Sequence, residues 1–105
     1  MKHINEIIPC VILAGGKGRR MGGKEKGLIN LLDRPLISYV LEKVSGKAAP
    51  IALNINTNFE KFKNFGYEIL EDPLKGHLGP LVGILASLNW AKKIKQKWVL
   101  TLPCD

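Results

Sequence analysis

Four short apolar runs alternate along the chain with three segments of helical periodicity. The first run, from Pro9 to Leu13, is continuously apolar and stops at Gly15-Gly16. This pattern is typical of a strand that is buried on both faces of a sheet. The other three runs predict strands over 51–55, 67–70 and 98–102.

The segments between these runs predict three helices. Apolar residues from Leu36 to Val44 recur at helical spacing, and Asn58 is expected to cap a short polar helix that continues to Lys63. The longest helix is expected over 81–93. Its apolar positions fall on one side, which is expected to be the buried side together with Trp90: Leu81, Ile84, Leu85, Leu88 and Ala91.

The order strand, helix, strand, helix, strand, helix, strand predicts a single α/β domain over residues 1–105. The expected architecture is a Rossmann-like three-layer α/β/α arrangement with a mostly parallel sheet. In such sheets, ligands bind beyond the carboxyl ends of the strands. The glycine-rich segment, Asn54, Asp72 and Asp105 all follow predicted strand ends, so four polar signals converge on one edge.

The segment from Gly15 to Gly27 interleaves glycines with basic side chains directly after a buried strand. Glycines let the backbone approach a ligand closely, and successive N–H groups with nearby cations bind phosphate oxygens. The pattern therefore predicts a phosphate-binding loop. A Walker A loop is excluded because Glu25 stands where a metal-binding hydroxyl belongs, and a dinucleotide fingerprint is excluded because Met21 replaces its third glycine.

The formal net charge of +7, from 16 basic and 9 acidic residues, favours an anionic partner. A second basic group at the end of the long helix is interpreted as a solvated face, so no nucleic-acid partner is expected: Lys92, Lys93, Lys95 and Lys97. No apolar run approaches the roughly 20 residues of a membrane span, and no signal peptide is evident. Cys10 and Cys104 are expected to be buried, reduced thiols of a cytoplasmic protein.

The sequence from Leu13 to Lys26 reads L-A-G-G-K-G-R-R-M-G-G-K-E-K. It resembles the signature loop of the nucleoside-triphosphate-transferring superfamily, with Glu25 in place of the more usual aspartate. The implied fold is of the nucleotide-diphospho-sugar transferase type. Further matches, spread over Val11 to Asp105, resemble the first half of molybdenum cofactor guanylyltransferases: Lys26-Gly27-Leu28, Asn54, Glu71-Asp72, Gly79-Pro80-Leu81-x-Gly83-Ile84 and Pro103-Cys104-Asp105.

The resemblance implies transfer of GMP from GTP to molybdopterin, which yields the guanine dinucleotide form of the cofactor and releases pyrophosphate. It implies Mg²⁺ as cofactor, held by Asp105, and Arg20 and Lys26 as the groups that stabilise charge on the triphosphate. The residues that it assigns to nucleotide binding follow the strand ends and the loop: Leu13, Ala14, Gly15, Gly16, Lys26, Asn54, Asp72, Gly79 and Asp105.

Several alternatives stay open on the sequence alone. Asn54 could simply satisfy a backbone group at a strand end, and Asp72 before Pro73 could be ordinary turn chemistry. A related enzyme that uses CTP, or that transfers a nucleotide to a sugar phosphate, has the same loop signature. Because the chain stops directly after a predicted strand, it is expected to be truncated and to lack the acceptor-binding half, so an inactive nucleotide-binding remnant is also considered. A monomer is compatible with the sequence.

Overall fold

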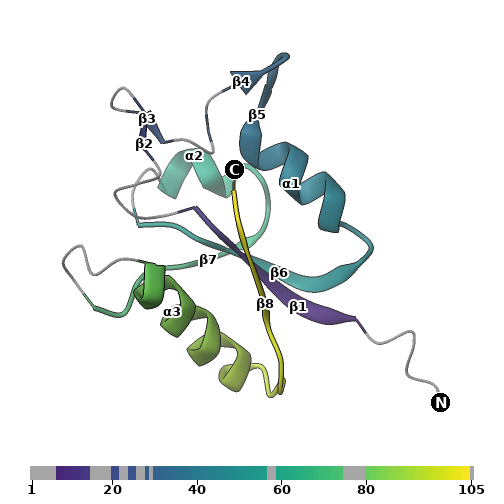
Figure 1. Cartoon of the computed structure of the whole chain (residues 1–105), viewed down its shortest axis with the longest axis vertical. Coiled ribbons are helices and arrows are strands. Elements are labelled where there is room, and N and C mark those ends of the chain that lie inside the picture. Colours follow the sequence, from purple (N-terminus) through teal and green to yellow (C-terminus); the bar gives the residue numbers. More distant parts are fainter. Residues whose placement is uncertain are drawn as a thin grey trace.

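The computed structural model describes residues 7–14, 20–21, 24–25, 28, 30–56, 59–74 and 80–104, with the backbone alone at 20–21, 24–25 and 80. A four-stranded parallel sheet in the order β7-β6-β1-β8 forms its centre (Figure 1). The elements in chain order are β1 (Ile8–Leu13), β2 (Arg20–Met21), β3 (Lys24–Glu25), β4 (Asn30–Leu31), β5 (Arg34–Pro35), α1 (Leu36–Val44), β6 (Ala48–Asn54), α2 (Phe59–Lys63), β7 (Glu68–Leu70), α3 (Pro80–Lys93) and β8 (Leu100–Pro103).

Strand β1 lies in the middle because it is apolar on both faces. Cys10, Val11 and Ile12 are all fully buried. Strand β1 pairs with β6 on one side and with β8 on the other, both in parallel. The register with β6 shifts between Ile8 and Cys10, around Pro9, which has no N–H to donate to the ladder.

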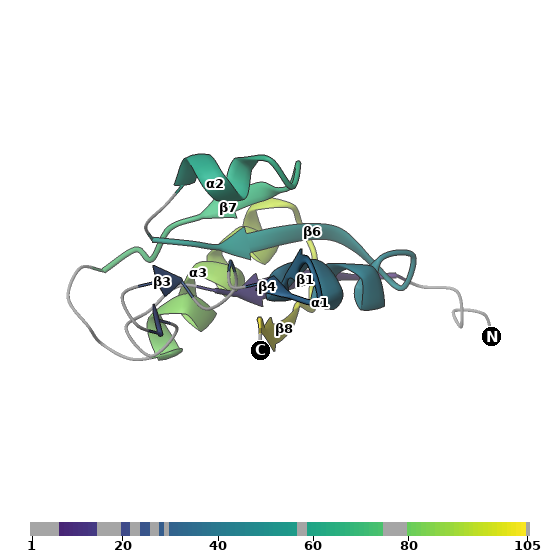
Figure 2. The same cartoon turned by 90° about the horizontal axis from the view of Figure 1, so that it is seen from above.

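The connections place the helices on both faces of the sheet, so the predicted α/β/α layering is confirmed. From β1 the chain steps outward to β6 and then to β7 through α1 and α2; α3 then returns it to β8 beyond β1. Right-handed crossovers in opposite directions put α1 and α2 on one face and α3 on the other. Figure 2 shows the four strands side by side, from β7 at the top to β8 at the bottom.

Each face has its own apolar core. Side chains of α1 and α2, including Ile37, Leu41 and Phe62, pack with Ile12 and Leu53. On the opposite face, the cluster is smaller and contains Val11, Ala52 and Trp90 of α3, which is 4% exposed. The predicted burial of Trp90 is therefore confirmed.

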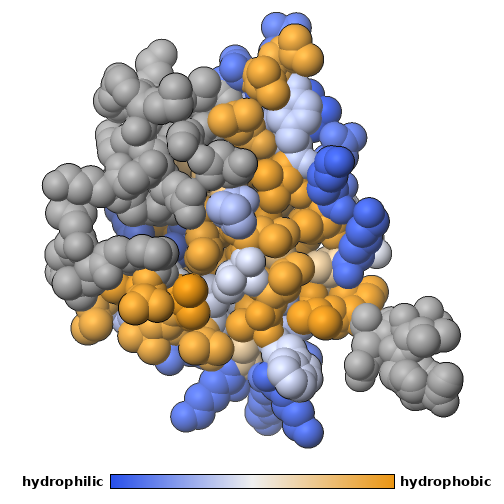
Figure 3. Space-filling model, viewed as in Figure 1, coloured by the Kyte–Doolittle hydropathy of each residue, from blue (hydrophilic) through white to orange (hydrophobic). Residues whose placement is uncertain are grey.

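The prediction for the buried side of α3 is wrong for its leucines. Leu81, Leu85 and Leu88 are 72%, 39% and 54% exposed. The helix is apolar on two sides, and the side that packs on the sheet carries smaller residues together with Trp90 and Ala91: Val82, Gly83, Ala86 and Ser87. Small side chains allow the helix to approach the strands closely. The leucines remain on the surface, and Figure 3 shows an apolar patch over α3 and β8.

Most other boundaries agree with the sequence prediction within one or two residues. The exception is β6, which begins at Ala48 because Ala48 pairs with Ile8. Strand β8 begins two residues later than predicted, at Leu100, and Trp98 before it is 73% exposed. Two short antiparallel pairs, β2 with β3 and β4 with β5, were not predicted as such. The proposed cap residue Asn58 lies outside the described residues. None of the described helices is long and apolar enough to cross a membrane.

Both cysteines are buried thiols, as predicted. Burial raises the pKa of the Cys10 thiol above its ordinary value, because desolvation disfavours the thiolate. Below the ordinary thiol pKa of about 8.5, folded and unfolded chains both keep the proton and the thiol adds no pH dependence. Above that value the unfolded chain loses its proton first, so the free energy of unfolding falls as pH rises, until the folded pKa is passed.

We therefore expect the urea-induced unfolding free energy to decrease between about pH 8 and pH 10 by more in the wild-type chain than in Cys10→Ala. The alanine variant is less stable overall because it leaves a small cavity, so the comparison is between pH slopes at fixed temperature. Equal slopes in the two proteins would contradict the assignment of this pH dependence to Cys10.

Candidate nucleotide site

All four strands of the sheet end at the same level on one edge, which is called the rim here. Leu13 of β1 lies opposite Asn54 of β6 and also opposite Pro103 of β8, while Asn54 lies opposite Leu70 of β7. From β1 the chain adds β6 and β7 on one side and then crosses over to add β8 on the other side, so the strand order reverses between β1 and β8. In such folds ligands bind in the crevice at this reversal, which lies beyond the ends of β1 and β8. This register agrees with the prediction that Asn54 and Asp72 lie at strand ends: Asn54 is the last residue of β6, and Asp72 follows the end of β7 by two residues.

Of the residues predicted to form the site, the structure describes four completely and brings them together at the rim: Leu13, Ala14, Asn54 and Asp72. The backbone of Arg20 lies in β2, paired with Glu25 of β3. The other predicted residues lie outside the described residues, and their roles stay predictions: Gly15, Gly16, Lys26, Gly79 and Asp105.

Asn54 is a buried polar residue, only 3% exposed. Its Nδ2 donates to the backbone oxygen of Leu70 at 3.1 Å and to Asp72 Oδ1 at 3.0 Å. Both partners are acceptors, so the amide nitrogen must face them and both of its hydrogens are used. The alternative in which Asn54 satisfies a backbone group at a strand end is therefore true in part: its hydrogen bond to the Leu70 oxygen satisfies a backbone acceptor at the end of β7, and its second hydrogen bond does not.

The amide oxygen of Asn54 faces helix α3. A Cβ added at Gly83 would lie 2.6 Å from Asn54 Oδ1 and 3.4 Å from Leu13 Cδ2. The backbone of Asn54 also accepts from the Ala14 N–H at 3.0 Å. One side chain thus connects β6 with the end of β7 and lies directly against the first turns of α3.

Asp72 is held through its backbone as well as through its carboxylate. Its N–H donates to Asn56 Oδ1 at 2.8 Å, and Oδ1 accepts from Asn54. Within the described part of the chain, Asp72 Oδ2 makes no hydrogen bond. Asp72 is therefore more than a turn residue before Pro73: it presents one carboxylate oxygen from a doubly attached position.

Sequence reasoning missed two residues of this arrangement. Asn56 was not singled out, although its place two residues after Asn54 was a signal that both could reach the same neighbouring strand. Gly83 belongs to the segment Gly79-Pro80-Leu81-x-Gly83-Ile84, but nothing in the sequence explained a glycine there; the structure shows that a Cβ at this position would collide with Asn54.

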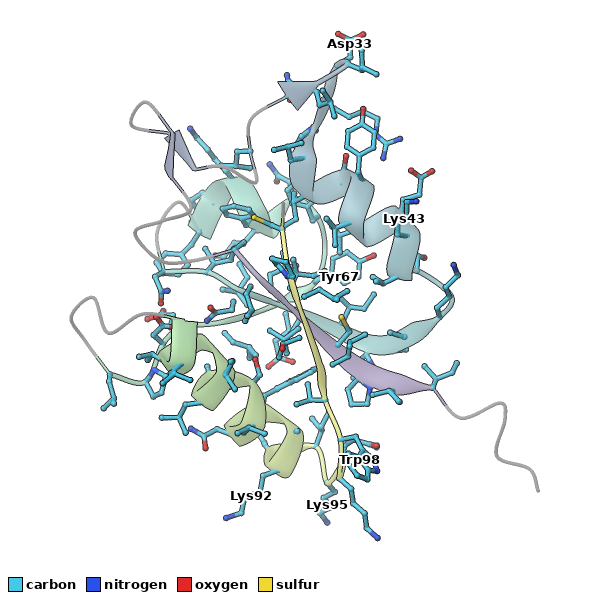
Figure 4. The ribbon with its side chains drawn as sticks, viewed as in Figure 1. Asp33, Lys43, Tyr67, Lys92, Lys95 and Trp98 are labelled. Atoms are coloured by element: carbon cyan, nitrogen blue, oxygen red, sulfur yellow. The ribbon has the colours of Figure 1, made fainter. Side chains whose placement is uncertain are left out.

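The electrostatic setting of the rim differs from that of the second basic group. Helix α3 begins with Pro80, a residue that suits a first helical position, and its N-terminal end favours anions. Lys92 and Lys95 lie with Trp98 at the opposite end of α3, before β8 begins (Figure 4). All four lysines of that group are exposed, which agrees with their interpretation as a solvated face.

No group of three His, Cys, Asp or Glu side chains that could hold a metal ion occurs among the residues that the structure describes. The predicted Mg²⁺ ligand, Asp105, is not among them. The metal therefore stays a prediction from the resemblance.

Comparison with known proteins identifies the family. The model of the MobA-like NTP transferase domain matches residues 10–105. The chain belongs to this family. It is 41% identical over 98 residues to a molybdenum cofactor guanylyltransferase of Shewanella putrefaciens and 40% identical to one of Yersinia pestis, each over 93% of this chain and 49% of the relative. The chain thus spans about half the length of the curated relatives that it matches.

A solved structure has the same fold at low sequence identity. It is the CMP:2-keto-3-deoxy-manno-octonic acid synthetase complexed with CTP, with a TM-score of 0.61 and 16% identity, over 94% of this chain and 39% of that chain. The family and this neighbour confirm the two main sequence predictions, a Rossmann-like α/β fold and membership of a nucleotidyltransferase family.

The contact between Gly83 and Asn54 yields a prediction for stability. Gly83→Ala gains about 1 kcal/mol of helix propensity, but its Cβ displaces the Asn54 amide, at an overpacking cost of about 1–3 kcal/mol plus weakened hydrogen bonds. We expect a net fall of about 1–2 kcal/mol in the free energy of unfolding, measured by urea denaturation. The control Asn89→Ala, at an exposed position of the same helix, should change it by less than about 0.5 kcal/mol. A Gly83→Ala variant as stable as the wild type would contradict the close contact.

Proposed function

We propose that this domain binds GTP at the rim and that it is the nucleotide-binding half of a guanylyltransferase for the molybdenum cofactor. The observation that carries the proposal is the Asn54–Asp72 pair, fixed at the carboxyl edge of the sheet beside the end of β1, where the glycine-rich segment begins. The membership of the MobA-like family and the names of the relatives support it.

The proposed reaction is an in-line displacement at phosphorus. A phosphate oxygen of molybdopterin attacks the α-phosphorus of GTP, a new P–O bond forms, and the bond to the α–β bridging oxygen breaks as pyrophosphate leaves. Such a step depends on positioning and charge neutralisation rather than on covalent participation of the protein. In this proposal the backbone of 13–16 holds the nucleotide, while Arg20 and Lys26 stabilise the negative charge that develops on the departing pyrophosphate.

Mg²⁺ fits the donor set that the proposal assigns to it. This ion keeps several waters and is usually bound by one or two carboxylates together with substrate phosphates, so the carboxylate of Asp105 and a triphosphate are suitable ligands for it. When bound, the ion neutralises charge on the triphosphate. The acceptor-binding residues belong, in this proposal, to the half of the relatives that the chain does not cover.

The first test is the thermal unfolding of the chain with GTP, CTP and ATP, each with and without Mg²⁺. A ligand at a hundred times its dissociation constant stabilises the folded state by about 2.7 kcal/mol, which raises the melting temperature of a small domain by about 10 °C or more. We expect the largest shift with GTP and Mg²⁺. A larger shift with CTP would favour the related CTP-using enzyme, and no shift from a chain that melts cooperatively would favour the inactive remnant.

A second test addresses Lys26. A charge-assisted bond from lysine to a phosphate contributes more than a neutral hydrogen bond, so Lys26→Ala should weaken GTP binding by at least about tenfold, measured by calorimetry. Lys97→Ala is the matched control, since Lys97 is exposed in the connection between α3 and β8, and the dissociation constant of this variant should equal that of the wild type. Equal affinity in the Lys26 variant would remove this residue from the site.

A further inference from the structure

The first residues after β7 are attached to the end of β6 at two separate points. Asn54 donates to the carboxylate of Asp72, at 3.0 Å, and Asn56 accepts from the backbone N–H of Asp72, at 2.8 Å. The adjoining ladder supports both contacts, because the Leu70 oxygen accepts from the Ile55 N–H at 3.0 Å as well as from Asn54. Backbone and side chain of one residue are thus fixed together.

A third constraint comes from the sequence. Asp72 precedes Pro73, and the proline ring restricts the residue before it to extended conformations. The remaining freedom of Asp72 lies in its position relative to β6 and in the rotation of its side chain. Asn56 limits the first and Asn54 limits the second, so the direction of Oδ2 is set by the pair.

Asn54 and Asn56 differ in what they have left to offer a ligand. Both hydrogens of the Asn54 amide are used within the protein, and its side chain is almost completely buried. Asn56 is half-buried, and its amide oxygen is used by Asp72. Two side-chain acceptors of this group make no hydrogen bond within the described part of the chain, Asn54 Oδ1 and Asp72 Oδ2. Asn54 Oδ1 belongs to an almost completely buried side chain and faces α3, so Asp72 Oδ2 is the one of the two on a partly exposed residue.

We propose that Asn56 is a positioning residue of the nucleotide site, which acts through Asp72. This inference rests on the proposed function and adds to it that Asp72 Oδ2 accepts a hydrogen bond from the nucleotide. The amide oxygen of Asn56 accepts from the Asp72 N–H and fixes the Asp72 backbone, so that Asp72 Oδ2 is oriented before the nucleotide binds. Preorganisation of this kind raises affinity because less conformational freedom is lost on binding.

The test is a double-mutant cycle on GTP affinity, followed by NMR titration so that weak binding is also measured. Asn56→Ala removes one hydrogen bond to a backbone group and should weaken GTP binding by about fivefold to tenfold. In the Asp72→Ala background the same substitution should have no further effect, because no carboxylate is left to orient. Asn64→Ala, an exposed asparagine after α2, is the matched control and should bind as the wild type does.

The amide resonance of Asp72 provides a readout independent of the nucleotide. The exchange of this amide hydrogen with solvent should become faster in Asn56→Ala, be unchanged in Asn64→Ala, and remain slow in Asn56→Asp, which keeps an oxygen acceptor of the same reach for the Asp72 N–H. The Asn56→Asp variant also keeps the test open if the alanine variant does not fold. Unchanged GTP affinity in Asn56→Ala, or equal losses with and without the Asp72 carboxylate, would overturn the positioning role while the proposed function stands. A wild-type chain that binds no GTP would instead overturn the proposed function and the inference with it.

Discussion

The register of β1 with its two neighbours determines where polar chemistry can occur in this domain. Leu13 lies opposite both Asn54 and Pro103, so β6, β1 and β8 end at one level. The interior of β1 is fully buried on both faces. A polar side chain there would be removed from water without a ready partner, at a cost of about 1–3 kcal/mol. The ends of the strands are therefore the first places along the sheet where polar groups can meet.

The parts of the fold that follow from local composition could be predicted from the sequence. A run such as Pro9 to Leu13 has no polar residue, so a strand buried on both faces is the structure that satisfies it. The beginning of β6 could not be predicted in this way. Ala48 has little intrinsic preference for a strand, and its place there depends on pairing with Ile8, forty residues earlier in the chain.

Helix α3 shows a different limit of periodicity. Its leucines and its small residues both recur at helical spacing, so the pattern identifies a helix but does not say which side faces the sheet. Gly83 decides this, because the helix comes so close to Asn54 that a Cβ would lie 2.6 Å from the amide oxygen. Similarly, the sequence indicated Asn54 and Asp72 as site residues, whereas their connection through hydrogen bonds, and the part of Asn56 in it, required the positions of β6 and β7.

The hydrogen bonds of Asn54 also change what this residue can contribute to recognition. An amide whose two hydrogens already serve Leu70 and Asp72 cannot donate to a nucleotide base without breaking a buried bond. Breaking one would leave a buried acceptor unsatisfied, at a cost similar to the gain from the new contact. Asn54 is therefore better explained as the link between β6 and the end of β7 than as a donor that distinguishes one base from another. Asp72 keeps one carboxylate oxygen, Oδ2, without a hydrogen bond in the described part of the chain, and the two asparagines hold the residue that carries it.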